Sequence, residues 1–308
     1  LSRLRRCPTM TRKLLVAICT HLKGQEALQL ARQVVALPID DGWEVNAVIV
    51  ENQPLPRLDP DLIAHKAIHH AHEPAVGLSN ARNKALDMAI ALNADWIGFF
   101  DDDQVLHSDW LSVFSQDARD DDVDLLYGPA LPQTSAATNK LIRTKNKPAF
   151  GTGNAFVHAR LFHPRHLGLR FDPRFNLTGG EDSYFYRAAK RAGATIRFNP
   201  HLQVTTPIDP ARRRPLQRLY RYLCGGAIRS TMLRYERNYA ALYIGMPQVA
   251  LILVGSGLVW FVKEALFRRS ISVLSGLFEL TLVLSHAFGM LLGLFGIRFY
   301  YYRNYRGE

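Results

Sequence analysis

The 308-residue chain contains only three cysteines, and their placement does not indicate a disulfide or a metal site. Cys7, Cys19 and Cys224 lie far apart in the sequence, and no two of them have the short spacing of zinc ligands. An odd number of cysteines also argues against a disulfide framework. A reducing environment that faces the cytosol is the simplest interpretation.

The N-terminal region lacks the long apolar core of a signal peptide, because its basic residues lead only into the short run LLVAIC at 14–19. We therefore expect a mature cytosolic start. The chain also lacks a nucleic-acid recognition motif, and no row of aromatic side chains accompanies its basic residues. Its net charge of +11 is thus expected to attract a lipid surface or a phosphorylated substrate, and no nucleic acid.

The first two hundred residues alternate strand-like and helix-like patterns, which is typical of an α/β domain. Apolar runs at 14–20, 44–52 and 95–100 predict buried strands. Helical repeats at 25–37 and 78–93 separate these runs. The hydrophobic content of 48% is enough to build a core for such a domain.

Polar residues stand at the end of each predicted strand, namely Thr20, Glu51 and the triplet Asp101 to Asp103. Because open α/β sheets bind ligands beyond the carboxyl ends of their strands, we expect these side chains to converge. Three adjacent carboxylates repel one another, and for the triplet alone an exposed acidic turn would be the simplest explanation. The buried strand before the triplet instead favours a site for Mg²⁺ or Mn²⁺, whose other ligands are typically substrate phosphates.

A second acidic motif, GGEDSYFYRAAKR, begins at Gly179. The two glycines permit a tight turn, and Glu181 and Asp182 then begin a predicted helix. A carboxylate in this position is usually a helix cap. Together with a metal site it becomes a candidate general base. The turn GTGN at 151–154 is expected to leave backbone amides accessible near the same region.

The C-terminal part of the chain is apolar. Residues 239–262 contain no charged side chain, and as a helix they are long enough to cross a hydrocarbon core of roughly 30 Å. A second run at about 271–297 is interrupted by Glu279 and His286. We expect a spanning hairpin with both ends in the cytoplasm, because arginines flank it; one span plus an interfacial helix remains an alternative, since the intervening loop is also basic.

Residues 207–238 are rich in arginine and carry apolar residues at helical spacing. This pattern favours an amphipathic helix in the plane of anionic lipid headgroups. The alternative is a solvated basic face that packs on the preceding domain.

In order and spacing, the segments VAICTH, VIVEN, GLSNARNKAL, WIGFFDDDQ, GTGN and GGEDSYFYRAAKRAGA resemble family-2 glycosyltransferases of the GT-A fold, of the bacterial exopolysaccharide type. The resemblance covers about residues 13–205. It implies a Rossmann-like α/β catalytic domain at 1–206, the basic helix at 207–238 and membrane segments at 239–308. It further implies an enzyme of the inner membrane whose catalytic domain faces the cytoplasm.

The resemblance also implies the roles of individual residues. Thr20, Glu51, Arg82, Asp101 and Asp102 would bind the nucleotide sugar, Asp103 the Mg²⁺ or Mn²⁺, and Asp182 would be the catalytic base, while Glu181, Gly180 and Asn154 would form the acceptor site. Glu51 stands where the family usually has the Asp that contacts uracil. The resemblance therefore implies a nucleoside diphosphate but does not specify its base.

The implied reaction is a single inverting displacement that moves one sugar from a nucleotide-diphospho-sugar, by family habit a UDP-sugar. The acceptor for such enzymes is commonly a polyprenyl-diphosphate oligosaccharide at the membrane. The segment QRLYRY at 217–222 departs from the Q-x-x-R-W motif of processive synthases, so one sugar is expected per encounter.

Three other functions remain to be weighed. The stretch FFDDDQV also fits a haloacid-dehalogenase-type phosphatase with Asp101 as nucleophile and Asp103 as acid/base, but the later acidic motif lacks the further Asp which that chemistry needs. A binding module without catalysis is a second alternative. A nucleotidyltransferase is a third, although Lys23 and Gly24 lack the glycine-rich loop it would require.

Overall fold

A computed structural model describes residues 11–38, 42–63, 65–133, 150–210, 214–263 and 273–302. The chain divides into a sheet unit, Leu1–Asn176 with Glu181–Ile208, and a helical unit, Leu177–Gly180 with Asp209–Glu308. Cys7 lies outside the described residues. So do several arginines that flank the two apolar runs, namely Arg212, Arg213, Arg268, Arg269, Arg303 and Arg306.

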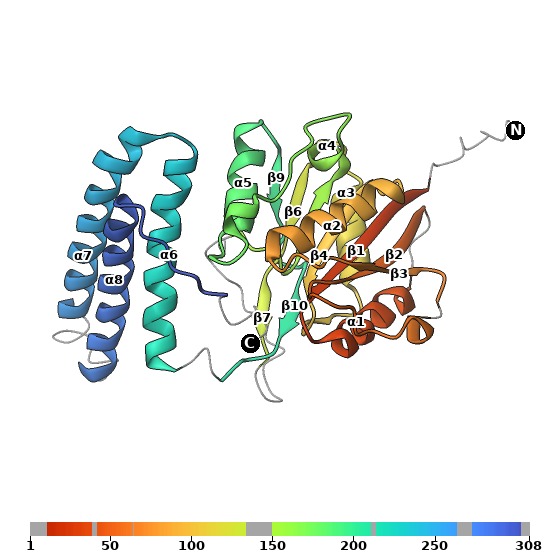
Figure 1. Cartoon of the computed structure of the whole chain (residues 1–308), viewed down its shortest axis with the longest axis horizontal. Coiled ribbons are helices and arrows are strands. Elements are labelled where there is room, and N and C mark those ends of the chain that lie inside the picture. Colours follow the sequence, from red (N-terminus) through yellow and green to blue (C-terminus); the bar gives the residue numbers. More distant parts are fainter. Residues whose placement is uncertain are drawn as a thin grey trace, which may run out of the picture. The chain divides into compact units, whose positions relative to one another are not determined.

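The sheet unit contains a seven-stranded sheet with the order β3-β2-β1-β4-β8-β6-β9 and a three-stranded sheet with the order β5-β10-β7 (Figure 1). The strands are β1 (Arg12–Thr20), β2 (Trp43–Glu51), β3 (Ile68–His72), β4 (Trp96–Asp101), β5 (Val105–Leu106), β6 (Leu125–Tyr127), β7 (Ala130–Pro132), β8 (Ala155–His158), β9 (Ile196–Phe198) and β10 (Val204–Thr206). In the large sheet, β8 runs antiparallel to β4 and β6, while the other pairs are parallel.

Helices cover both faces of the large sheet. They are α1 (Gly24–Ala36), α2 (Leu78–Ala91), α3 (Trp110–Ala118), α4 (Ala159–Phe162) and α5 (Glu181–Arg191), with short 3₁₀ turns at Pro60–Ile63 and Pro173–Phe175. Side chains of β1 alternate between the faces, because successive residues of a strand point in opposite directions. Leu14 and Val16 pack with α1 and α3, whereas Leu15 and Ala17 pack with α2 and α5. Burial on both faces explains why this strand is a continuous apolar run.

The carboxyl ends of β1, β2 and β4 meet at one edge of the sheet. Thr20 is in register with Glu51, and Cys19 with Asp101. The strand order reverses at β1, because β2 and β3 lie on one side of it and β4 lies on the other. Such a switch point is where α/β sheets bind their ligands. The antiparallel β8 also begins at this edge, since Ala155 pairs with Phe99.

The helical unit contains α6 (Pro215–Tyr235), a π-helical turn (Ala241–Gly245), α7 (Met246–Lys263) and α8 (Val273–Leu294), which lie side by side (Figure 1). Two stretches, Ala241–Lys263 and Val273–Leu294, are long and apolar enough to cross a membrane, with mean hydropathies of 1.8 and 1.7. Both lie within the two runs that the sequence predicts, apart from one residue, Lys263. The predicted amphipathic helix at 207–238 contains α6, which packs along α8.

Candidate active site

The first carboxylate cluster comprises Asp101, Asp102 and Asp103 at the end of β4. Asp102 accepts a hydrogen bond of 2.8 Å from the hydroxyl of Thr20, at the end of the neighbouring β1. Burial raises the pKa of Asp102, and this is opposed by the Thr20 hydroxyl and a nearby lysine. The two strand ends therefore form one site, as the sequence predicts from their position.

Lys23 also belongs to this site, although its place in the sequence bears only on the nucleotidyltransferase alternative. Its Nζ lies 3.5 Å from Asp102 Oδ1 and 3.8 Å from Asp103 Oδ2. Lys23 immediately precedes α1, so the loop after β1 brings its ammonium group to the end of β4. A cation at this point partly neutralises two carboxylates that would otherwise repel each other.

The turn 151–154 separates the first carboxylate cluster from the second, which comprises Glu181 and Asp182. A Cβ on Gly153 would lie 2.6 Å from Asp101 Oδ2, and a Cβ on Gly151 would lie 3.7 Å from Asp182 Oδ2. Gln104 secures the turn, because its Nε2 donates a hydrogen bond of 2.8 Å to the carbonyl of Gly153. The two acidic motifs are thus neighbours on either side of one glycine-rich turn.

The second carboxylate cluster is held by an arginine from α2. Arg82 forms an ion pair with Glu181 Oε1, and both side chains are largely buried. The guanidinium also lies over the ring of Phe171, 5.6 Å from its centroid. Glu181 Oε2 is buried and has no hydrogen-bond partner. Arg82, predicted to hold the nucleotide, is therefore found at the second cluster.

Asp182 is the half-buried member of this pair, and its environment raises its pKa above that of an exposed aspartate. Burial and the negative charge of Glu181 raise the pKa of Asp182 to about 6, although Arg82 opposes the change. A carboxylate with this pKa is ionised at neutral pH and holds a proton more strongly than an exposed aspartate. It can therefore accept a proton from a hydroxyl group, as a general base must.

Glu51 is completely enclosed by donors from its own surroundings. Its two carboxylate oxygens accept hydrogen bonds from the Gln53 side chain, from the backbone N–H groups of Arg57 and Leu58, and from His70 Nε2 at 2.8 Å. A carboxylate has about four acceptor positions, and all of them are engaged here. The contacts observed for Glu51 are thus with the loop after β2 and with His70 of β3.

Two residues predicted for the acceptor site, Asn154 and Gly180, shape the local backbone, and their role toward an acceptor stays a prediction. Asn154 is fully buried, and its side-chain amide donates a hydrogen bond of 2.7 Å to the carbonyl of Leu202. Its φ of 129° is unusual for a residue other than glycine and shapes the turn before β8. Gly180 belongs to the helical unit, and its φ of 91° favours glycine.

The first carboxylate cluster fits a divalent cation. Mg²⁺ is commonly held by one or two carboxylates together with substrate phosphates. Asp103 is partly exposed, and with Asp102 it already contacts the cationic Lys23. Within the described ranges no three histidine, cysteine or acidic side chains are grouped so that they could hold a metal ion by themselves.

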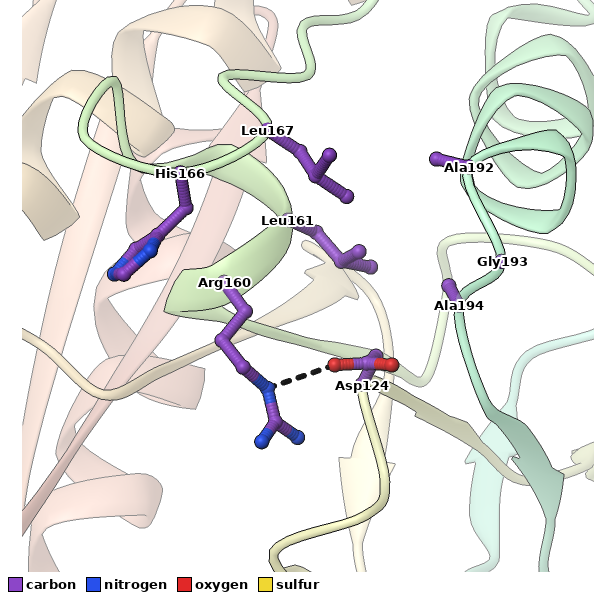
Figure 2. Close-up of a pocket in the computed structure, with 8 residues that line it drawn as sticks. All are labelled: Asp124, Arg160, Leu161, His166, Leu167, Ala192, Gly193 and Ala194. Atoms are coloured by element: carbon purple, nitrogen blue, oxygen red, sulfur yellow. Dashed lines mark hydrogen bonds and ion pairs between the residues drawn. The ribbon is translucent and has the colours of Figure 1, made fainter.

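A separate hollow of about 370 Å³ lies at the opposite edge of the sheet (Figure 2). Asp124, which precedes β6, and Arg160, which follows β8, contact each other there at 2.8 Å. The other lining residues are Leu161, His166, Leu167, Ala192, Gly193 and Ala194. None of the residues of the two carboxylate clusters lines this hollow.

Known proteins resemble this chain in sequence. Residues 18–187 match the family described as "Glycosyl transferase family 2". The chain is 25% identical over 224 residues to the succinoglycan biosynthesis protein ExoM of Rhizobium meliloti (strain 1021), covering 67% of this chain and 70% of that protein.

Two solved structures share the fold. One is the mannosyltransferase PcManGT from Pyrobaculum calidifontis in complex with GDP-Man and Mn²⁺, with a TM-score of 0.59, 14% identity, and coverage of 92% of this chain and 88% of that one. The other is S. aureus TarS (residues 1–349) in complex with UDP, with a TM-score of 0.51, 12% identity and 92% coverage of both chains. Because the family match extends over more than half of its length, the chain belongs to glycosyl transferase family 2 and is a glycosyltransferase with a GT-A-like fold.

Proposed function

We propose that the protein transfers one sugar from a nucleotide-diphospho-sugar, with a UDP-sugar as the favoured donor, to a polyprenyl-diphosphate oligosaccharide at the cytoplasmic face of the inner membrane. The observation that carries this proposal is the placement of Asp101 and Asp182 on the two sides of the turn 151–154. One carboxylate cluster can bind the diphosphate through a cation, and the other can take a proton from the acceptor.

The reaction is an inverting displacement. Asp182 removes the proton from the acceptor hydroxyl, and the resulting oxygen attacks the anomeric carbon from the side opposite the diphosphate. A new bond between this carbon and the acceptor oxygen forms as the bond to the phosphate oxygen breaks. The nucleoside diphosphate leaves with the bonding electrons, and no covalent sugar–enzyme intermediate is formed.

The first carboxylate cluster serves the leaving group. Asp103, with Asp102 beside it, would hold Mg²⁺ or Mn²⁺, which when bound supplies positive charge for the departing diphosphate. Thr20 orients Asp102 through its hydroxyl. Lys23 contacts the same carboxylates, and its ammonium group can pair with the negatively charged diphosphate when the donor enters.

The buried groups take supporting roles. Arg82 orients Glu181 and moderates the pKa of Asp182, while Glu51 fixes the loop that follows β2. Direct contact of Arg82 with the nucleotide and of Glu51 with the base stay predictions from the resemblance. Complexes of the fold relatives with GDP-Man and with UDP support a nucleotide donor without deciding the base.

The phosphatase interpretation is not retained, because the family match identifies a glycosyltransferase. A catalytically inactive binding module is not retained either, because the family match identifies a glycosyltransferase.

The test incubates the detergent-solubilised full chain with Mn²⁺ or Mg²⁺ and a panel of nucleotide sugars and measures release of nucleoside diphosphate. We expect metal-dependent release from one donor, lost in Asp103→Asn and in Asp182→Asn. The exposed Asp122→Asn is the matched control and should retain full activity. Release from no donor, or undiminished release by Asp182→Asn, would contradict the proposal.

A further inference from the structure

The helical unit is built around close contact between α6 and α8. The carbonyl of Leu219 accepts a hydrogen bond of 2.9 Å from Ser285, and Ser230 donates one of 2.8 Å to the carbonyl of Met290. An ion pair of 2.8 Å joins Arg218 to Glu279. Since the residue numbers rise together along both helices, α6 and α8 are parallel and lie at the same level.

Glycines allow the backbones of these helices to touch. A Cβ on Gly226 would lie 2.0 Å from the carbonyl oxygen of His286, and a Cβ on Gly289 would lie 2.0 Å from that of Leu223. Small residues at a four-residue spacing, here Gly289 and Gly293, are typical of tightly packed helix pairs. The position of α6 along the length of α8 is therefore fixed by the packing of the two helices.

Non-helical backbone covers another side of α6. The loop Leu177–Gly180 belongs to this unit, and a Cβ on Gly180 would lie 2.4 Å from Ile228 Cγ2. The backbone N–H of Tyr302 donates a hydrogen bond of 3.0 Å to the carbonyl of Leu177. The ring of Tyr220 stacks against that of Tyr301, with 6.3 Å between their centroids. Irregular backbone of this kind is not tolerated where it would face lipid tails.

Charged side chains also mark α6 along its length. Arg221 and Arg229 of α6 are exposed, as are Arg214 just before the helix and Arg237 just after it. An arginine at hydrocarbon depth is costly, whereas arginines among anionic headgroups are favourable. If α8 crossed a bilayer, the parallel α6 beside it would carry Arg221, Arg229 and the loop Leu177–Gly180 into the hydrocarbon.

The apolar surface of the unit lies instead on α7 and on one face of α8. Leu251 and Val259 of α7 are 74% and 67% exposed, and Leu284, Phe288 and Leu291 of α8 are exposed at helical spacing. Residues 209–308 contain fourteen arginines and lysines but only five carboxylates, so nine of the eleven net positive charges are in this part of the sequence. Apolar faces bordered by basic residues match an anionic lipid surface.

We propose that the helical unit does not cross the membrane but inserts sideways into one anionic leaflet, with α7 and α8 parallel to the bilayer plane and α6 above them on the aqueous side. This topology does not depend on which sugar is transferred or on the base Asp182. It departs from the spanning hairpin that the sequence predicts, and it leaves both ends of α7 on the side of the catalytic residues.

Cysteine labelling in the full chain tests this topology. Lys263→Cys places a thiol at the far end of α7, and Lys66→Cys places one on the exposed surface of the sheet unit as the control. A membrane-impermeant maleimide is applied to intact spheroplasts and to inside-out vesicles, and labelling of the parent chain is subtracted. We expect the two thiols to be labelled from the same side, to within twofold. Labelling of Lys263→Cys from the opposite side, or from neither side, would overturn the proposal.

The depth of α7 gives a second test. Trp260 is the exposed tryptophan, since Trp43, Trp96 and Trp110 are buried. In a Trp260→Phe background, Ile252→Trp reports the middle of α7 in phosphatidylglycerol vesicles that contain brominated lipids. We expect bromines near the headgroups to quench its fluorescence at least twofold more than bromines at the chain ends. Stronger quenching from the bilayer centre, or equal binding to phosphatidylcholine vesicles, would contradict the sideways insertion into an anionic leaflet.

Discussion

The two carboxylate clusters have the same charge but different surroundings. Asp102 and Asp103 lie at a strand end, where a hydroxyl and a lysine contact them and Asp103 is partly open to solvent. Glu181 and Asp182 begin a helix against the buried guanidinium of Arg82. These surroundings are the basis for the proposal that the first cluster binds a cation and the second accepts a proton.

The neighbours of each carboxylate explain this difference, because burial raises the pKa in both clusters. At Asp102 the Thr20 hydroxyl and Lys23 oppose the rise in pKa. A carboxylate removed from water beside another negative charge has a raised pKa, as Asp182 does at about 6. The proposed division of roles, with a metal at one cluster and a proton acceptor at the other, follows these surroundings.

The largest effect is expected from Asp182→Asn. An amide cannot accept the acceptor proton, so kcat should fall by roughly a thousandfold, within the range of general-base catalysis. Donor hydrolysis in the absence of acceptor and transfer to acceptor are measured together with the release of nucleoside diphosphate. Retention of more than a tenth of the transfer rate would show that Asp182 is not the base.

A smaller loss is expected from Asp103→Asn, because Asp102 and Lys23 remain at the site. We expect kcat/KM to fall by about a hundredfold, the scale of losing one charge-stabilising group, and more Mn²⁺ to be needed for half-maximal rate. Titration with Mn²⁺ after removal of metal by a chelator measures this. An unchanged Mn²⁺ requirement would move the metal site elsewhere.

The pH dependence should distinguish the clusters more finely. Asp182 is protonated below its pKa, so kcat/KM should be low at pH 5 and rise to a plateau above about pH 7. Glu181→Gln removes a charge that raises this pKa, and the acidic limb should move to lower pH. The pH profile of both proteins is the measurement, and a limb that moves upward or stays in place would contradict the coupling.

The smallest effect is expected at Lys23. Its ammonium competes with a metal for Asp102 and Asp103, and at about 4 Å in water such a charge contributes ~1 kcal/mol. Lys23→Met should therefore strengthen Mn²⁺ binding without nucleotide by about threefold to fivefold in calorimetry. Weaker Mn²⁺ binding would show that Lys23 supports the metal site rather than competing for it.

Local patterns predict much of the sheet unit. The runs at 14–20, 44–52 and 95–100 correspond to β1, β2 and β4, and the repeat at 78–93 to α2. Each signal lies within one element, where apolar spacing reports directly on burial. The meeting of Thr20 with Asp102 then follows from the rule that parallel strands end at one edge.

Contacts between distant elements could not be predicted in the same way. Arg82 and Glu181 are 99 residues apart, and nothing in either motif specifies the other as partner. The antiparallel β8, which brings the turn 151–154 to Asp101, is too short to produce a pattern. In α6, the apolar spacing predicts a helix face that lies among lipid headgroups or packs on the preceding domain, but it does not predict that glycines bring α6 against α8.

The division of roles between the clusters is tested most directly by calorimetric binding of a nucleoside diphosphate with Mn²⁺ to Asp103→Asn and Asp182→Asn. Asp182→Asn should bind as tightly as the unaltered protein, to within about threefold, while failing to transfer sugar. Asp103→Asn should lose at least tenfold in affinity. Equal loss of binding in both variants, or none in Asp103→Asn, would contradict the separation of metal binding from proton removal.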